Sequence, residues 1–204
     1  MGLLGFTVAI LALLTALGIF LVAHQPALTT TPRGKAFAFV VFFVLPLSIT
    51  GFAAAAHLEK AKSTEFCLSC HEMEPYGQSL AFADTDAVPA SHYQNRLVPR
   101  ESACFTCHTT YTLFGDLKAK MNGMKHVWIH YTGQTPAKIS LYEPYNNREC
   151  LSCHGASRSF LESAGHEGLF SDLRANATSC LECHNLVHDA QNVAGHQTWS
   201  APAP

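Results

Sequence analysis

Charged residues are scarce in this chain: Asp, Glu, Lys and Arg make up 14% of its 204 residues, and the formal net charge is −2. No run of basic side chains occurs, and nucleic-acid binding needs clustered Lys and Arg to neutralise phosphates. We therefore exclude nucleic acid as a partner. Hydrophobic residues make up 48%, a large share for a water-soluble protein, which predicts that part of the chain lies in lipid.

Charge is absent altogether from residues 2–23 and 36–56. Each segment is about as long as a helix that crosses the hydrocarbon core, roughly 20 residues. A cleaved signal peptide is the alternative for the first segment, but such a peptide usually opens with basic residues, and MGLLGFTVAI has none. Pro46 and Gly51 are tolerated in a membrane helix and predict a kink in the second segment. Residues 1–60 are therefore predicted to form an anchor of two transmembrane helices.

The link between the two segments carries only two charges, Arg33 and Lys35. The positive-inside rule places such a loop in the cytoplasm, so both flanking ends should lie on the outer face. We expect a two-pass protein of the inner (cytoplasmic) membrane. Its periplasmic domain should span residues 61–198, and residues 199–204 should form a disordered tail.

The eight cysteines all belong to one repeated string, Cys-x-x-Cys-His, which occurs four times. Two thiols three positions apart can form thioethers with the vinyl groups of one haem, and the adjacent histidine can bind its iron. Zinc ribbons and disulfides are the alternatives, but neither explains a histidine after every second cysteine. The strings predict four covalently attached c-type haems, numbered here in chain order. Their attachment residues are Cys67, Cys70 and His71; Cys104, Cys107 and His108; Cys150, Cys153 and His154; and Cys180, Cys183 and His184.

Histidine is in surplus, because the chain has twelve and the four strings use one each. Such a surplus suggests further iron ligands, although a solvated surface position is the ordinary alternative for any single histidine. We prefer that alternative for His24 and His57, which border the apolar segments. The others are His92, His126, His130, His166, His188 and His196.

The first string extends to CLSCHEM over residues 67–73, and it resembles the NapC/NirT/NrfH family of membrane-anchored tetrahaem quinol dehydrogenases. The resemblance continues at residues 91–96, 117–130 and 180–188, and covers most of residues 66–188. It implies a role in anaerobic respiration, with quinol as the electron donor. It also implies a periplasmic redox protein or reductase complex as the acceptor, and so a hetero-oligomer.

By this resemblance haem 1 faces the quinol, and in one branch of the family its iron is bound by the methionine of the extended string, here Met73. We favour Met73, while ligation by His71 with Met73 packed against the ring stays open. His126 lies in a segment that in the family reaches the distal face of haem 1, so it is expected to bind the iron or accept a quinol proton. His130, four residues later, shares a helical face with His126 and is a fallback ligand.

The family also uses a lysine in this region, so Lys118 and Lys120 are candidates for the quinol site. A solvated helix face is the alternative for both. The resemblance supplies the remaining ligand pairs, which would tie distant parts of the chain together through iron. These pairs are His108 with His188, His154 with His92, and His184 with His166.

The haems themselves are expected to form most of the outer domain's core. We predict a mainly α fold with much irregular loop, in which short helices surround the strings, residues 132–147 form a long loop and sheet is almost absent. The two-helix anchor departs from the single helix that is commonest in the family. The leading functional hypothesis is a quinol dehydrogenase. The alternative is a non-catalytic relay or anchor subunit that takes electrons from another protein. A reductase acting at an open haem is disfavoured, because doubly ligated iron has no vacant position.

Overall fold

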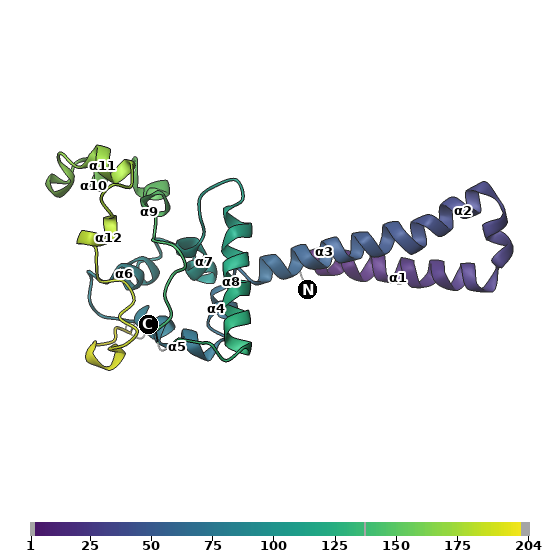
Figure 1. The fold of residues 1–204 in the computed structure, drawn as a ribbon, viewed down its shortest axis with the longest axis horizontal. Coiled ribbons are helices and arrows are strands. Elements are labelled where there is room, and N and C mark those ends of the chain that lie inside the picture. Colours follow the sequence, from purple (N-terminus) through teal and green to yellow (C-terminus); the bar gives the residue numbers. More distant parts are fainter. Residues whose placement is uncertain (1–2, 137, 201–204) are drawn as a thin grey trace. The chain divides into compact units, whose positions relative to one another are not determined.

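The computed structural model describes residues 3–136 and 138–200. The chain divides into two compact units, residues 1–61 and 62–204, which are described separately below (Figure 1). Most of the predicted tail lies outside the described residues. Within the described part, Trp199 donates its backbone amide to the carbonyl of Ala81, 2.7 Å away.

Unit 1 is a helical hairpin, in which α1 runs alongside the helix formed by α2, η2 and α3 (Figure 1). The two helices, Leu3–His24 and Pro32–Lys60, are long and apolar enough to cross a membrane. Their elements are α1 (Leu3–His24), η1 (Pro26–Thr30), α2 (Pro32–Phe39), η2 (Val40–Val44) and α3 (Leu45–Lys60).

The second helix contains one π turn, η2, directly before Pro46. The amide of Leu45 donates to the carbonyl of Val40, five residues back instead of four. Proline lacks an amide hydrogen, and its ring crowds the carbonyl four residues earlier. A wider turn relieves that crowding, so the helix continues through Pro46 and Gly51 to Lys60.

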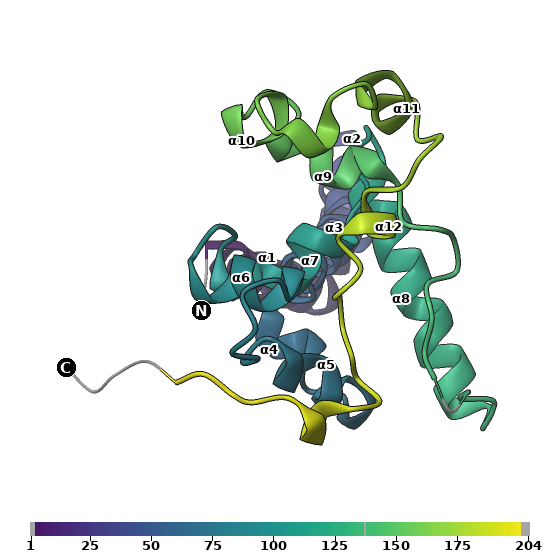
Figure 2. The same cartoon turned by 90° about the vertical axis from the view of Figure 1, so that its left-hand side faces the viewer.

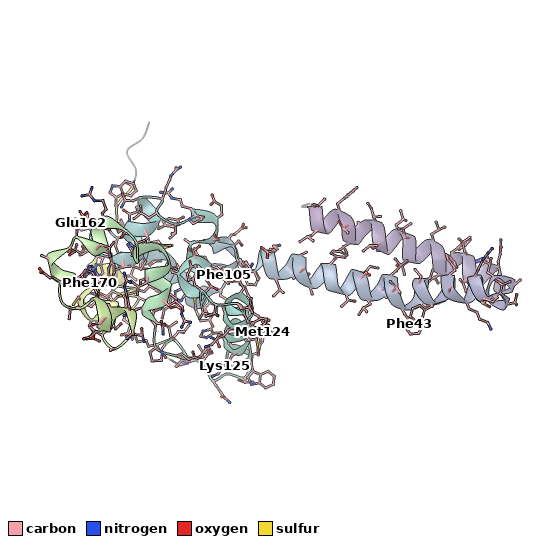
Figure 3. All side chains as sticks on the ribbon, turned by 90° about the horizontal axis from the view of Figure 1, so that it is seen from above. Phe43, Phe105, Met124, Lys125, Glu162 and Phe170 are labelled. Carbon is pink, nitrogen blue, oxygen red and sulfur yellow. The ribbon has the colours of Figure 1, made fainter. Side chains whose placement is uncertain are left out.

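The hairpin is held by close approach of its two helices. A Cβ atom built on Gly18 would lie only 2.5 Å from Cγ2 of Val41, whose side chain is 1% exposed. Small residues allow such contact between membrane helices. The remaining large apolar side chains of the hairpin mostly point outward, as Figure 3 shows for Phe43, which is 65% exposed. A surface this apolar is suited to lipid and not to water.

Unit 2 consists of short helices joined by irregular segments. Among its described residues there is no strand, only a single antiparallel bridge between Phe82 and Thr198. The described residues between the end of α8 and the start of α9, the region of the predicted loop, form no helix. The predicted fold class is confirmed. The helices are α4 (Thr64–Cys67), α5 (Glu74–Ser79), α6 (Val88–Gln94), α7 (Ala103–His108), α8 (Gly115–Tyr131), α9 (Asn147–His154), α10 (Arg158–Leu161), α11 (Phe170–Arg174) and α12 (Cys180–Cys183), with 3-10 turns at His71–Met73, Arg100–Ser102, Ala164–His166 and Val193–Gly195.

The apolar core of unit 2 is small. Its buried cluster consists of Phe82, Ala87 and Ala90, with Leu186 and Val193 packed against it. A domain of this size normally buries many more large side chains. The small cluster supports the prediction that haems supply much of the interior. Figure 2 shows the helices of unit 2 spread apart, with α8 along one side and α10 and α11 at another end.

Candidate haem-binding sites

Each Cys-x-x-Cys-His string lies in or beside a short helix: α4, α7, α9 or α12. Positions three apart on a helix are neighbours on one face, so both thiols of a string can meet one haem edge. Polar caps fix where three of these helices begin. Ser63, Asn146 and Ser179 accept backbone amide hydrogen bonds ahead of α4, α9 and α12, and Ser179 forms a capping box with Glu182.

The structure brings together the two imidazoles of each ligand pair predicted for haems 2, 3 and 4. Two imidazoles on opposite sides of one metal, each with a metal–nitrogen bond of about 2.0 Å, would have ring centroids about 6 Å apart. The observed separations fit that arrangement, so a haem iron could lie between the rings of each pair. They are 6.2 Å for His108 and His188, 5.8 Å for His92 and His154, and 6.3 Å for His166 and His184.

One ring in each of these pairs has its Nδ1 atom engaged by the protein. The partner is a backbone carbonyl for two rings and a serine hydroxyl for the third, and that hydroxyl itself donates to the carbonyl of Tyr76. Nδ1 therefore carries the ring hydrogen, and Nε2 is left as the lone-pair donor for iron. The contacts are His92 to Val88, 2.8 Å; His166 to Phe160, 2.9 Å; and His188 to Ser79, 2.6 Å.

Burial favours the neutral form of these imidazoles, which is the form that binds iron. Burial, with the nearby charge of His108, lowers the pKa of His188 to about 4. Burial also lowers the pKa of His108 and of His154 below the ordinary histidine value. The chemistry of the donor set therefore fits haem ligation.

The candidates around the first string make separate contacts. The ring of His71 pairs with His130, at 5.8 Å between centroids. His126 packs instead against Tyr142, with ring centroids 4.7 Å apart and Nδ1 3.1 Å from the tyrosine hydroxyl. Met73 is half-buried at the end of a 3-10 turn.

The two lysine candidates point in different directions from α8. Lys118 forms an ion pair with Glu143, with 2.6 Å between Nζ and Oε2. Nζ of Lys120 lies over the ring of Phe105 in the second string, 4.5 Å from its centroid. It is also close enough to Cys67 for its positive charge to interact with that side chain. Lys120 is thus the candidate that lies beside the first two strings.

Two polar residues that sequence reasoning missed connect neighbouring strings. Thr64 is 7% exposed; its hydroxyl donates to the carbonyl of Arg100 at 2.7 Å and accepts the amide of Ala103 at 2.9 Å. These bonds join the first string to the second. Thr64 stands three residues before the first cysteine of its string, and Asn147 occupies the same offset in the third.

Asn147 joins the third string to the fourth. Its side chain is 2% exposed, donates to the carbonyls of Leu173 and Thr178 at 2.8 and 2.6 Å, and accepts the amide of Cys180 at 2.9 Å. Its backbone amide donates to the side chain of Asn176 at 2.7 Å. A spacing shared by Thr64 and Asn147 was the only available signal for either residue.

Asn147→Ala should destabilise the domain by about 3 kcal/mol, because it leaves several buried backbone groups without partners. Denaturant unfolding of the haem-loaded protein would measure this loss. The matched control is Asn146→Ala, which removes only the helix cap of α9 and should cost about 1 kcal/mol. Equal losses in the two variants would contradict the role assigned to Asn147.

Comparison with known proteins identifies relatives over most of the chain. It is 24% identical to cytochrome c-type protein NapC of Haemophilus influenzae over 159 residues, which are 68% of this chain and 73% of that protein. NapC of Paracoccus pantotrophus is 25% identical over 171 residues, which are 74% of this chain and 68% of that protein. Cytochrome c-type protein TorY of Haemophilus influenzae is 24% identical over 158 residues, which are 69% of this chain and 40% of that protein. No solved structure matches.

The family model described as the NapC/NirT cytochrome c family, N-terminal region, matches residues 31–193. The match covers the second helix of the hairpin and nearly all of unit 2, and α1 lies outside it. A c-type cytochrome carries its haem on cysteines such as those of the repeated string. The protein therefore belongs to the NapC/NirT cytochrome c family, as a membrane-anchored electron-transfer protein with covalently bound haem c.

Proposed function

We propose that this protein oxidises a membrane quinol, menaquinol or ubiquinol, and passes the electrons through four c-type haems to a periplasmic acceptor protein. It would act as the membrane subunit of a hetero-oligomer. Haem c supplies a one-electron redox centre at each string. The observation that carries the proposal is that the four strings follow one another in space as they do in the chain.

This succession rests on contacts between cysteines of neighbouring strings. A cysteine of the first string lies beside one of the second, and a cysteine of the third lies beside one of the fourth. A cysteine of the second string is close enough to one of the third to interact electrostatically. Because each string lies next to the following one, the arrangement supports an electron path that enters at the first string and leaves at the fourth. The pairs are Cys67 with Cys104, Cys107 with Cys153, and Cys150 with Cys180.

An exposed apolar stripe on α8 supports a quinol site at the membrane surface. The stripe repeats every three or four residues, as one face of a helix does, and each member is more than half exposed. Tryptophan and tyrosine within it are typical of the membrane interface, and we assign the lipid surface as its partner. Figure 3 shows Met124 at the outside of α8. The stripe consists of Leu117, Met121, Met124, Trp128 and Tyr131.

The proposed topology places both ends of the hairpin on the periplasmic side. Arg33 and Lys35 lie at the start of the second helix, beside the turn, where the positive-inside rule favours the cytoplasm. Residues 36–56, free of charge, rise about 30 Å as a helix, which matches the hydrocarbon thickness. The first string begins seven positions after Lys60, in the domain proposed to be periplasmic.

Quinol oxidation releases two protons with two electrons, so the site needs a proton acceptor. Burial, together with the charge of Lys125, lowers the pKa of His126. A lowered pKa keeps this imidazole neutral near pH 7 and able to accept a proton. Its contact with Tyr142 holds the ring in place. His126 is therefore our proton acceptor.

Lys120→Ala should slow quinol oxidation about tenfold to a hundredfold, since it removes a charged hydrogen-bond donor beside the first string. Lys118→Ala is the matched control, because Lys118 is paired with Glu143 on another side of α8. Steady-state quinol oxidation in detergent would measure both rates. The assignment fails if the Lys118 variant is the slower of the two.

The function is tested by anaerobic mixing of the purified, detergent-solubilised protein with a reduced menaquinone analogue, while the haem α-band is followed. Rapid reduction, slowed in the Lys120 variant, is the expected result. Reduction by dithionite but not by the quinol analogue would overturn the proposal. That outcome would leave a relay subunit that receives electrons from another protein.

A further inference from the structure

The rings of His71 and His130 form a fourth histidine pair with the same spacing as the other three. Their centroids are 5.8 Å apart, and the planes are inclined at 70°. The pair that we assign to haem 3, His92 with His154, has the same centroid distance and an inclination of 79°. The His71–His130 pair therefore has the separation expected for two ligands on one iron.

The carboxylate of Glu72 lies beside Nδ1 of both rings. Its Oε1 accepts the Nδ1 hydrogen of His130 at 2.5 Å, and its Oε2 lies 3.4 Å from Nδ1 of His71. The Glu72 side chain is only 19% exposed, so the contact is partly shielded from water. With Nδ1 turned to the carboxylate, Nε2 of each ring is the atom left for a metal. The other three pairs use neutral oxygen partners, whereas this one uses a carboxylate.

His126 lies on the same helix as His130 but makes other contacts. Its Nδ1 faces the hydroxyl of Tyr142, and its ring packs on the ring of that tyrosine. Its contacts are therefore directed away from His71.

We infer that His71 and His130 are the two axial ligands of the iron of haem 1, and that Glu72 is the positioning residue for both. The inference rests on a haem being attached at Cys67 and Cys70, as in the proposed function. With two histidine ligands the iron would have no vacant position, so quinol would give up its electrons at the haem edge without binding iron. The same ligation would tie α8 to the first string. It also leaves His126 free to accept a proton.

The wild-type ligands can be tested by low-temperature magnetic circular dichroism and electron paramagnetic resonance of the oxidised, haem-loaded protein. We expect every haem to be low-spin with two histidine ligands. A histidine–methionine charge-transfer band, or a high-spin haem, would overturn the inference. No quinol is present, so this result is separate from that of the quinol-mixing experiment.

Variants identify the distal ligand. His130→Gly should turn one haem high-spin with unchanged haem content, and added imidazole should restore the low-spin signal. His126→Ala and Met73→Leu should keep the wild-type spectrum. If His130→Gly does not accumulate, His130→Met takes its place and should convert one haem to histidine–methionine ligation. A high-spin haem in His126→Ala would contradict the inference.

Glu72→Gln tests the positioning role. Glutamine can still accept a hydrogen bond but carries no charge, so the low-spin spectrum should persist. The reduction potential of one haem should rise, because the carboxylate favours the oxidised, more positive iron. Spectroelectrochemical titration would measure this shift. Unchanged potentials for all haems would overturn the role of Glu72.

Discussion

Replacing Cys150 and Cys153 by serine is expected to remove one haem per chain and to abolish electron delivery to the acceptor. Quinol should still reduce the haems attached at the first two strings. The reason is spatial order: Cys150 interacts with Cys180 of the fourth string, and Cys153 with Cys107 of the second. Loss of the third haem therefore interrupts the electron path between the second haem and the fourth. Haem content is measured by the pyridine haemochrome assay, and both electron-transfer steps by stopped-flow absorbance.

The control for this variant lies within the same string. Ser152 is exposed; its hydroxyl donates to the carbonyl of Glu149 at 2.9 Å and lies 4.0 Å from Sγ of Cys153. Ser152→Ala keeps both thiols and should behave as the wild type. Acceptor reduction at the wild-type rate in the double cysteine variant would show that electrons bypass the third string.

His126→Gln is expected to slow quinol oxidation about a hundredfold, the lower end of what a positioned acid–base group contributes. Glutamine keeps hydrogen bonding to Tyr142 possible but cannot accept a proton near pH 7. Haem content and the oxidised spectrum should not change. The rate is measured with the reduced menaquinone analogue under single-turnover conditions.

A second variant separates proton acceptance from ring orientation. Tyr142→Phe removes the hydroxyl that holds His126 and leaves the imidazole in place, so the rate should fall by less than it does in His126→Gln. If His126→Gln oxidises quinol at the wild-type rate, another group accepts the proton. In that case His126 has no part in the reaction.

The elements that could be predicted from sequence are those set by local rules. Two charge-free segments predicted the hairpin helices, and the repeated string predicted haem attachment, because spacing along the chain fixes both. The π turn before Pro46 follows from the chemistry of proline but is not visible in hydropathy. The mainly helical fold with a long loop before α9 was likewise predictable from the density of the strings.

The partner of His71 could not be chosen from sequence. His126 and His130 are four residues apart and share a face of α8, so periodicity treats them alike. The choice depends on how α8 packs against the first string, and Glu72 makes the decisive contact there. Thr64 and Asn147 were missed for the same reason, because their hydrogen bonds join segments distant in the chain.

The most direct test of the account is electron transfer across the whole chain in proteoliposomes. The membrane would contain menaquinol, and the outer solution a membrane-impermeant protein acceptor accessible to unit 2. The account predicts quinol-dependent reduction of the acceptor by the wild type, and none by the variant that lacks Cys150 and Cys153. Acceptor reduction that needs an added electron-donating protein, and that does not respond to menaquinol, would contradict it.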